Sequence, residues 1–299
     1  MKPDTRSFYE AMVHGAIERI ARSLDEALDL EALARQAGLS PFHFHRIFRG
    51  MTGETPLELS RRLRLERAAW QLSRTDTAVT DIAFDAGYDT HEAFTRAFRA
   101  CFSTSPSGFR EQGFRRITLA ATCGIHFNPE GTTTRFVPRD SGGQSMQVDI
   151  TELPARRVAS VRHIGPYNQI SKAFERLGEL AGPAGLFQAP EAAMVGLYYD
   201  DPDSVPPDQL RSDAGLFVSA DARLPPGLEE QHLAAGRYAK TIHTGSYEEL
   251  GDAWARFLGE WLPASGNRLG AGASFELYRN TPMEVPNERL VTELYAPLA

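Results

Sequence analysis

The segment between residues 30 and 110 contains two copies of one helix-turn-helix pattern, one on each side of a long helical run. The first copy reads LEALARQAGLSPFHFHRIFRGMTGETP, and the second reads TDIAFDAGYDTHEAFTRAFRACFSTSP. Gly38 and Gly87 are 49 positions apart, whereas Phe44 and Phe94 are 50 apart, so the second copy has one extra residue between its turn and its second helix. A repeat of this kind restricts the first third of the chain to an all-helical fold with two similar corners.

Each copy carries the local signals of two helices that meet at a tight turn. Gly38 and Gly87 follow the first helix of their copies, at a position where a turn favours a positive φ. Ser40 and Asp89 come next and are good N-caps, and Pro41 suits the first turn of the helix that follows. The alternative is an ordinary helical bundle that repeats by chance. The agreement of cap, turn glycine and closing proline between the copies argues against it.

The two units resemble the DNA-binding domain of AraC/XylS-type transcription regulators. The second unit, IAFDAGYDTHEAFTRAFRACFSTSPSGFR, is similar to the signature of that family almost throughout, and the resemblance extends over roughly residues 8–112. It implies an all-α domain at residues 1–115 that binds double-stranded DNA through two helix-turn-helix units.

In such a domain, the second helix of each unit enters the major groove with its N-terminal half toward the bases. Arg46 and Arg96 occupy matched positions and suit guanine O6 and N7, while Glu92 can accept a hydrogen bond from cytosine N4. The predicted DNA-binding residues are Phe42, His43, His45, Arg46 and Arg49 in the first unit and Thr90, His91, Glu92 and Arg96 in the second. A structure in which Arg46 and Arg96 are buried would contradict this interpretation.

The run from Leu57 to Leu72 is the strongest helix pattern in the chain and is predicted to be a rigid spacer. Its sixteen residues span roughly 24 Å at about 1.5 Å per residue. With the flanking helices, it can hold two recognition helices about 34 Å apart, one turn of DNA. Its arginines form either a phosphate-binding face or a solvated face, and the flanking units favour phosphate contact. These arginines are Arg61, Arg62, Arg64 and Arg67.

Charge is distributed unevenly along the chain. Residues 1–116 carry 17 Lys and Arg against 16 Asp and Glu, a net +1, and residues 117–299 carry 15 against 23, a net −8. The two parts add up to the −7 of the whole chain. A near-neutral first part and an acidic second part indicate two functions, and any positive charge that faces DNA must be local.

The sequence predicts no cofactor, metal site or membrane partner. No apolar run approaches the length of a membrane span and the N-terminus lacks a signal-peptide core, so we expect a cytoplasmic protein. Cys101 and Cys123 form no metal or disulfide pattern. His43 and His45 are two positions apart, a helical spacing that disfavours a metal pair.

Residues 116–145 contain Pro, Gly, Thr and Ser without a helical or strand period in their apolar residues, and they are predicted to be a linker.

Residues 146–299 are predicted to form an α+β domain built from a second internal repeat. Strand-like segments rich in Val, Ile, Tyr and Phe alternate with two helical runs, Asn168 to Ala181 and Tyr247 to Leu262. HIGPY at residues 163–167 returns as HTGSY at residues 243–247, and the same offset of 80 aligns further pairs without a gap. Two βαββ units are therefore expected to pack about a pseudo-two-fold axis.

Positions where this symmetry breaks are the informative ones for a ligand site between the two units. Glu276 takes the place of Gly196, and Trp254 takes the place of Phe174. If Phe275 and its neighbour Leu277 face the helices, Glu276 and Tyr278 share the other face. A carboxylate beside aromatic rings suits a cationic or hydrogen-bond-donating apolar ligand. The alternative is that Glu276 is a solvated residue of an edge strand.

Six segments of this half, in order, resemble the GyrI-like small-molecule-binding domain: HIGPY, GLYYDDPDSVP, LRSDAGLFV, LAAGRYAKTIHTGSYEEL, FELYRNTP and LVTELYAPL. In that family, a Glu in the strand that corresponds to FELY binds lipophilic and often cationic compounds among aromatic residues. The resemblance implies Glu276 as the ligand-binding acid, with Tyr167, Trp254 and Tyr278 as walls. The order of the two domains resembles that of Rob-type regulators.

Three functions remain open from the sequence. The favoured one is a transcription regulator whose small-molecule effector alters its engagement with DNA or RNA polymerase. The second is a hydrolase in which burial raises the pKa of Glu276 and makes it a general base. No other catalytic constellation supports that activity, and no catalytic residue is predicted. The third is a module that sequesters a protein partner.

Overall fold

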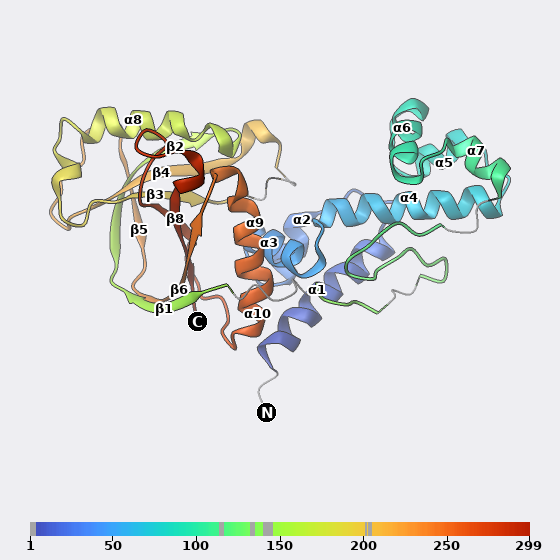
Figure 1. The fold of residues 1–299 in the computed structure, drawn as a ribbon, viewed down its shortest axis with the longest axis horizontal. Helices are drawn as coiled ribbons and strands as arrows, with labels where there is room; N and C mark the ends of the chain where they lie inside the picture. The colour runs from blue at the N-terminus through green and yellow to red at the C-terminus, as the bar shows by residue number, and fades with distance from the viewer. Residues whose placement is uncertain (1–3, 114–116, 132–134, 140–145, 201, 203–204) are drawn as a thin grey trace.

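The computed structural model describes residues 4–113, 117–131, 135–139, 146–200, 202 and 205–299. A helical N-terminal part is followed by a sheet flanked by helices, as Figure 1 shows. The two parts meet where α3 (Pro41–Thr52) packs on α9 (Leu250–Arg256). None of the helices in these ranges combines the length and the apolar content needed to cross a bilayer.

The first helix-turn-helix unit consists of α2 (Leu30–Gln36) and α3, with α1 (Thr5–Arg22) packed against it. Helix α3 begins as predicted, because the Ser40 hydroxyl accepts a hydrogen bond from the His43 amide at 3.3 Å and Pro41 occupies the first turn. Gly53 ends the helix in the left-handed region, with φ of 81°. The core of this unit includes Val13, Ile17, Leu33, Phe44 and Phe48.

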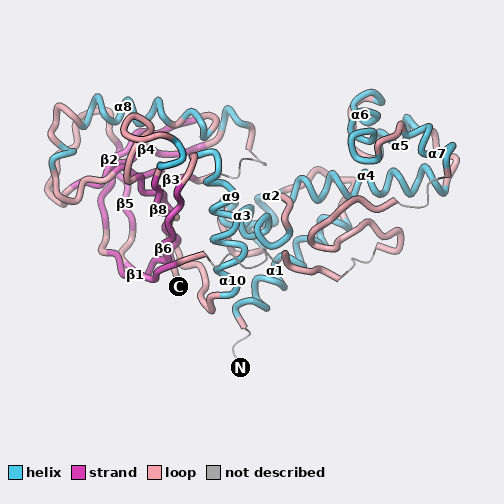
Figure 2. Tube along the Cα trace, in the orientation of Figure 1, coloured by secondary structure: helices cyan, strands magenta, loops and turns pink. Residues whose placement is uncertain are grey.

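Helix α4 (Pro56–Arg74) leads away from the sheet to the second unit, which lies at its far end (Figures 1 and 2). A capping box starts α4, since Thr55 accepts from the Glu58 amide and Glu58 accepts from the Thr55 amide. The second unit contains α5 (Val79–Asp85), α6 (His91–Phe102) and α7 (Pro106–Gln112). Its core is separate from that of the first unit and includes Phe94, Phe98 and Phe109.

The predicted N-cap of α6, Asp89, is wrong. Thr90 caps the helix instead, and its hydroxyl accepts a hydrogen bond from the Ala93 amide at 3.1 Å. The extra residue between the turn and the second helix of this copy shifts the cap by one position relative to the first copy.

Part of the predicted linker packs along α4, while residues 116, 132–134 and 140–145 of it lie outside the described residues. Cys123 and Ile125 are fully buried in the core of the first unit. Arg62 donates to the Ile125 carbonyl at 2.7 Å and to Glu54 at 2.6 Å. Arg62 therefore holds the connecting segment against α4, and the prediction that it contacts phosphate is wrong in this arrangement.

The C-terminal part is an antiparallel sheet with the strand order β1-β6-β8-β7-β3-β4-β2-β5. The strands are β1 (Val148–Leu153), β2 (Arg156–Ile164), β3 (Met194–Tyr198), β4 (Arg211–Val218), β5 (Glu229–Leu233), β6 (Gly236–Thr244), β7 (Phe275–Tyr278) and β8 (Val291–Pro297). The prediction of strands rich in Val, Ile, Tyr and Phe within residues 146–299 is confirmed. Strand β5, whose sequence EEQHL lacks the expected apolar residues, was not predicted.

Helices cover one face of the sheet in both repeats. Helix α8 (Ser171–Ala181) lies over the first repeat, and α9 continues through the π-helical turn η5 (Phe257–Trp261) into α10 (Leu262–Ala264) in the second. The described residues of this part also contain short 3₁₀ turns: η1 (Tyr167–Gln169), η2 (Leu186–Gln188), η3 (Pro207–Gln209), η4 (Tyr247–Glu249) and η6 (Asn287–Arg289).

The opposite face carries a core of its own. The Phe275 ring stacks on Tyr295 at 4.5 Å between centroids, and it also contacts Phe217 of β4 at 5.9 Å, although β3 lies between their strands. Contacts between rings on non-neighbouring strands require the sheet to curl toward this face. Glu276 and Tyr278 do share a face, but it is the helix-covered one, so the condition that Phe275 and Leu277 face the helices is not met.

Candidate functional site

The pseudo-two-fold axis of the C-terminal domain passes between β3 and β7. In this antiparallel pair, Gly196 lies opposite Glu276. The offset of 80 positions that relates the two repeats also pairs Gly196 with Glu276, so each is the other's equivalent. The symmetry break noted in the sequence therefore falls on the axis itself, where the two repeats meet.

Glu276 is enclosed and hydrogen-bonded on both carboxylate oxygens. The residue is 3% exposed, Trp254 of α9 donates to Oε1 at 2.8 Å, and the Tyr278 hydroxyl donates to Oε2 at 2.7 Å. Burial raises the pKa of Glu276, and the hydrogen bonds from Trp254 and Tyr278 and the positive charge of Arg46 act against that rise. The prediction of a carboxylate among aromatic residues is confirmed, and the edge-strand alternative is not.

Tyrosine rings extend this cluster symmetrically on both sides of the axis. The hydroxyls of Tyr198 and Tyr278 lie 2.8 Å apart, and because the Tyr278 proton is directed to Glu276, Tyr198 is the donor between them. Tyr167 packs edge to face on Tyr198 at 4.9 Å between centroids, and its equivalent Tyr247 packs on Tyr278 at 5.4 Å. The structure thus brings Trp254, Glu276 and Tyr278 into direct contact and places Tyr167 one ring away. The sequence reasoning missed Tyr198 and Tyr247, although the repeat pairs both with predicted residues.

Glycine at position 196 is required by these rings. A Cβ there would lie 2.6 Å from the Tyr278 hydroxyl and 3.0 Å from Tyr198 Cε2. Glu276 and its tyrosine neighbours on one strand therefore require a residue without a side chain, Gly196, on the paired strand.

The outer face of α3, predicted to read DNA, packs against this site. Phe42 meets Trp254 edge to face at 5.7 Å between ring centroids, and the guanidinium carbon of Arg46 lies 3.6 Å from the centre of the Phe42 ring. The imidazole of His43 is bonded through Nδ1 to the Ser40 hydroxyl at 3.0 Å and through Nε2 to the Ser274 hydroxyl at 2.7 Å. Burial lowers the pKa of His43 to about 4, and the nearby charge of Arg46 adds to this effect.

The exposure predicted for the first unit is therefore wrong in this conformation. Phe42, His43, His45 and Arg46 are all buried, and Arg46 is only 8% exposed. The physical reason is the C-terminal domain, which covers the face that the unit's own core leaves open.

Two glycines let the helices approach this closely. A Cβ on Gly50 would lie 2.1 Å from the Ala255 carbonyl oxygen, and one on Gly259 would lie 2.4 Å from the Gly50 Cα. Arg49, also predicted to bind DNA, donates to Asp252 at 2.6 Å at the rim of the contact. Sequence reasoning missed Gly50, Gly259 and Asp252, because no repeat or motif links them.

Helix α6 presents the second set of predicted DNA-binding residues to solvent. His91, Glu92 and Arg96 are exposed, and Thr90 is exposed while serving as the N-cap. The core face of the same helix is held by Phe94 and Phe98. The side chains predicted to reach bases thus project from a helix that is anchored on one face only.

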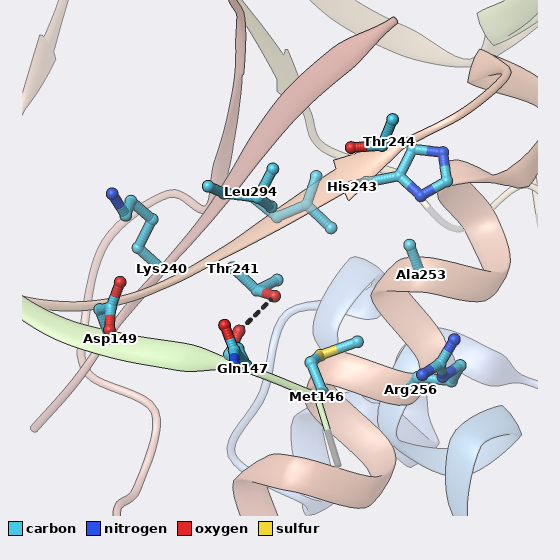
Figure 3. Close-up of a pocket in the computed structure, with 11 residues that line it drawn as sticks. Met146, Gln147, Asp149, Lys240, Thr241, His243, Thr244, Ala253, Arg256 and Leu294 are labelled. Atoms are coloured by element: carbon cyan, nitrogen blue, oxygen red, sulfur yellow. Dashed lines mark hydrogen bonds between the residues drawn. The ribbon is translucent and has the colours of Figure 1, made fainter. Parts of the chain in front are cut away.

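A separate cavity of about 270 Å³ lies between β1, β6, β8 and α9 (Figure 3). It is lined by Met146, Gln147, Asp149, Lys240, Thr241, Ile242, His243, Thr244, Ala253, Arg256 and Leu294. None of the predicted ligand-binding residues lines it, so it is not the predicted site. In the part of the chain that the structure describes, no cluster of three His, Cys, Asp or Glu side chains is placed to hold a metal ion.

Comparison with known proteins assigns both halves of the chain. The family described as GyrI-like small molecule binding domain matches residues 146–299, and the family described as helix-turn-helix domain matches residues 33–112. A DNA gyrase inhibitor from Yersinia enterocolitica is 35% identical over 140 residues, covering 45% of this chain and 87% of that protein. The regulatory protein SoxS of Salmonella typhimurium is 34% identical over 104 residues, covering 35% of this chain and 97% of SoxS.

Among solved structures, the C-terminal domain of EcmrR has 22% sequence identity and a TM-score of 0.45, covering 52% of this chain and 98% of that chain. The family matches and the two relatives divide the chain in the same way as its two internal repeats do. The chain belongs to the AraC-type helix-turn-helix regulators through its N-terminal half and to the GyrI-like small-molecule-binding family through its C-terminal half.

Proposed function

We propose that this chain regulates transcription in response to a lipophilic cation that binds beside Glu276. The observation that carries the proposal is an acidic side chain buried among aromatic rings, in a small-molecule-binding domain joined to a DNA-binding domain. We assign residues 1–115 to DNA binding, 116–145 to the connection and 146–299 to effector binding. RNA polymerase is a further proposed partner, because a bound regulator acts on transcription by contacting or obstructing it.

The cationic character of the effector follows from the cost of burying charge. An ionised carboxylate removed from water is stable only when a positive group or several hydrogen bonds compensate it. Aromatic rings such as Trp254 and Tyr278 also attract a cation to their faces, so the same walls that exclude water favour a positive ligand.

Isothermal titration with tetraphenylphosphonium, a lipophilic cation, tests the ligand class, and tetraphenylborate is an anion of nearly the same shape. The phosphonium is expected to bind and the borate is not. Glu276→Gln removes the charge and is expected to weaken phosphonium binding strongly. Equal affinity for the two ions would contradict the proposal. Hydrolysis of a panel of small esters that Glu276→Gln abolishes would instead favour the hydrolase.

The DNA-reading role of α6 is tested by selecting duplexes from a random pool with the full-length protein, with and without the phosphonium. Arg96→Ala is expected to weaken binding to the selected site by about 1–3 kcal/mol and to relax its preference at one base pair. Arg176→Ala removes an arginine from the exposed face of α8 and is the matched control, expected to leave the affinity unchanged. Equal affinity for selected and random DNA would contradict a sequence-specific regulator.

A further inference from the structure

Phe42 and Arg46 together reproduce the chemistry expected of the effector. The Phe42 ring packs on Trp254, and the Arg46 guanidinium lies over the Phe42 ring. Trp254 in turn donates to Glu276, so the Phe42 ring contacts the side chain that links α9 to the carboxylate, and the Arg46 charge lies on that ring. A lipophilic cation would bring the same two groups to the same place.

Helix α3 cannot enter a major groove while it is held in this contact. Residues 42–48 are buried without exception, between the core of their own unit on one side and α9 and η5 on the other. The backbones of Gly50 and Gly259 are so close that not even a methyl group fits between the helices. The surface of α3 that would contact bases in the major groove is the surface that α9 covers.

We propose that α3 is the built-in occupant of the effector site, with Phe42 and Arg46 in the place of an aromatic cation. A cationic effector must then displace α3, and the displaced helix becomes available to DNA. This coupling rests on the function proposed above and adds the route by which ligand binding reaches the DNA-reading face.

Charge explains why the displacing molecule has to be a cation. Glu276 and Arg46 are 3% and 8% exposed, and the positive charge of Arg46 lowers the pKa of Glu276 and so favours its ionised form. Withdrawing α3 would remove the positive charge of Arg46 and leave the buried carboxylate with only the hydrogen bonds from Trp254 and Tyr278, whereas a cationic ligand would restore a positive charge beside it. A neutral or anionic molecule of the same shape cannot replace Arg46, whereas a lipophilic cation replaces both the ring and the charge.

The docked state excludes the effector and keeps α3 from DNA, so the two ligands must favour each other. By thermodynamic linkage, the factor by which the effector tightens DNA binding equals the factor by which DNA tightens effector binding. We expect a factor on the order of ten, within the usual range for coupled sites.

Gly259→Ala tests this coupling in the full-length chain. The added Cβ would collide with the backbone of α3 but alters no residue predicted to touch DNA or the effector. We expect the variant to bind tetraphenylphosphonium about tenfold more tightly than the parent, and to bind the selected duplex about tenfold more tightly without the phosphonium. Ser274→Ala, which removes the hydroxyl bonded to His43, is expected to act in the same direction and serves if Gly259→Ala folds poorly.

Gly178→Ala is the matched control, because a Cβ on this α8 glycine meets nothing within 4 Å. It is expected to bind both ligands as the parent does. Phosphonium that binds the parent without changing its affinity for DNA would overturn the coupling. If no protein binds phosphonium, the ligand class proposed above is wrong. Tighter DNA binding by Gly259→Ala would then still support masking of α3, and unchanged DNA binding would refute it.

Discussion

Helices α3 and α6 are equivalent parts of one repeat, yet one is buried and the other is exposed. Each begins at a hydroxyl N-cap, anchors two phenylalanines in its own core and carries an arginine at the same place, Arg46 or Arg96. Arg46 is buried because the effector domain covers α3, whereas Arg96 faces solvent on a helix packed against α5 and α7. Two copies of one helix-turn-helix motif can therefore differ in their surroundings through the residues that face away from their cores. In this chain, one second helix packs on the C-terminal domain and the other is exposed.

Those outward residues differ in ways that match their surroundings. Phe42 in α3 corresponds to Glu92 in α6, and Gly50 corresponds to Ala100. An aromatic ring and a missing side chain suit a packed helix crossing, whereas a carboxylate in place of Phe42 would lose its hydration against the Trp254 ring. The core faces of the two helices are alike, so the difference lies wholly in what each helix offers to a neighbour.

The largest expected contrast comes from truncating this matched pair. Phe42→Ala removes a buried ring and is expected to lower the free energy of unfolding by about 3–5 kcal/mol. Glu92→Ala, at an exposed position, is expected to change it by less than about 0.5 kcal/mol. Urea denaturation of the full-length protein measures both, and similar values for the two variants would break the comparison between the helices.

Acidification is expected to weaken the docked arrangement through His43. Burial lowers the pKa of His43 from its ordinary 6.5 to about 4, so its contribution is complete above pH 6.5 and is lost as the pH falls toward 4. The shift corresponds to roughly 3 kcal/mol. Glu276, whose pKa burial raises, acts in the opposite direction, because its contribution is lost as the pH rises.

His43→Gln separates the two groups, since it removes the titrating ring and leaves Glu276 in place. The difference in free energy of unfolding between the parent and this variant is expected to shift against the parent between pH 6.5 and 4.5. Denaturation curves collected at several pH values measure it. A constant difference across this range would mean that His43 protonates as easily in the folded chain as in the unfolded one.

Gly50→Ala is expected to have a moderate effect. The new methyl group would meet the Ala255 carbonyl oxygen and the Gly259 Cα, and such overpacking costs about 1–3 kcal/mol. The equivalent exposed position takes the reverse change, Ala100→Gly, which is expected to cost about 0.5–1 kcal/mol through helix propensity alone. If Gly50→Ala stabilises the protein as an ordinary helix substitution does, the close crossing is absent in solution.

The smallest expected effect belongs to the rim of the contact. Arg49 and Asp252 form an ion pair whose side chains are both well exposed, and such pairs contribute about 0–1 kcal/mol. Asp252→Asn is therefore expected to change the free energy of unfolding by less than about 1 kcal/mol, and less still at high salt. A much larger loss of unfolding free energy would mean that the Arg49–Asp252 ion pair, and not Phe42 and the contact between Gly50 and Gly259, stabilises the docking of α3.

The sequence allowed each half of the fold to be predicted, because each half is a repeat whose signals agree internally. The helices of both units and the strands of both βαββ repeats follow from spacing and symmetry. The symmetry break singled out Glu276 and Trp254, and the resemblance to the GyrI-like domain implied that Trp254 and Tyr278 lie beside Glu276. Strand β5 was missed because its exposed and charged residues carry no apolar alternation. The face of β7 was assigned wrongly because both faces of the curled sheet are apolar and period-two alternation cannot distinguish them.

The contact between the halves could not be predicted in the same way. Gly50, Gly259 and Ser274 each have several ordinary explanations in a sequence. Nothing local indicates that Gly259 meets Gly50, or that Ser274 meets His43, across more than 200 positions. The available signal was Phe42, an aromatic residue on a helix face expected to meet DNA. Comparing it with Glu92 in the second copy would have indicated that α3 has a neighbour.

Amide hydrogen exchange of residues 41–52 and 91–102 in the full-length chain, with and without saturating tetraphenylphosphonium, tests the central claim most directly. We predict slow exchange in α3 alone, faster exchange in α3 once the phosphonium is bound, and no change in α6. If the phosphonium binds and α3 stays as protected as before, the phosphonium does not displace Phe42 and Arg46 from the effector site, and the account is contradicted.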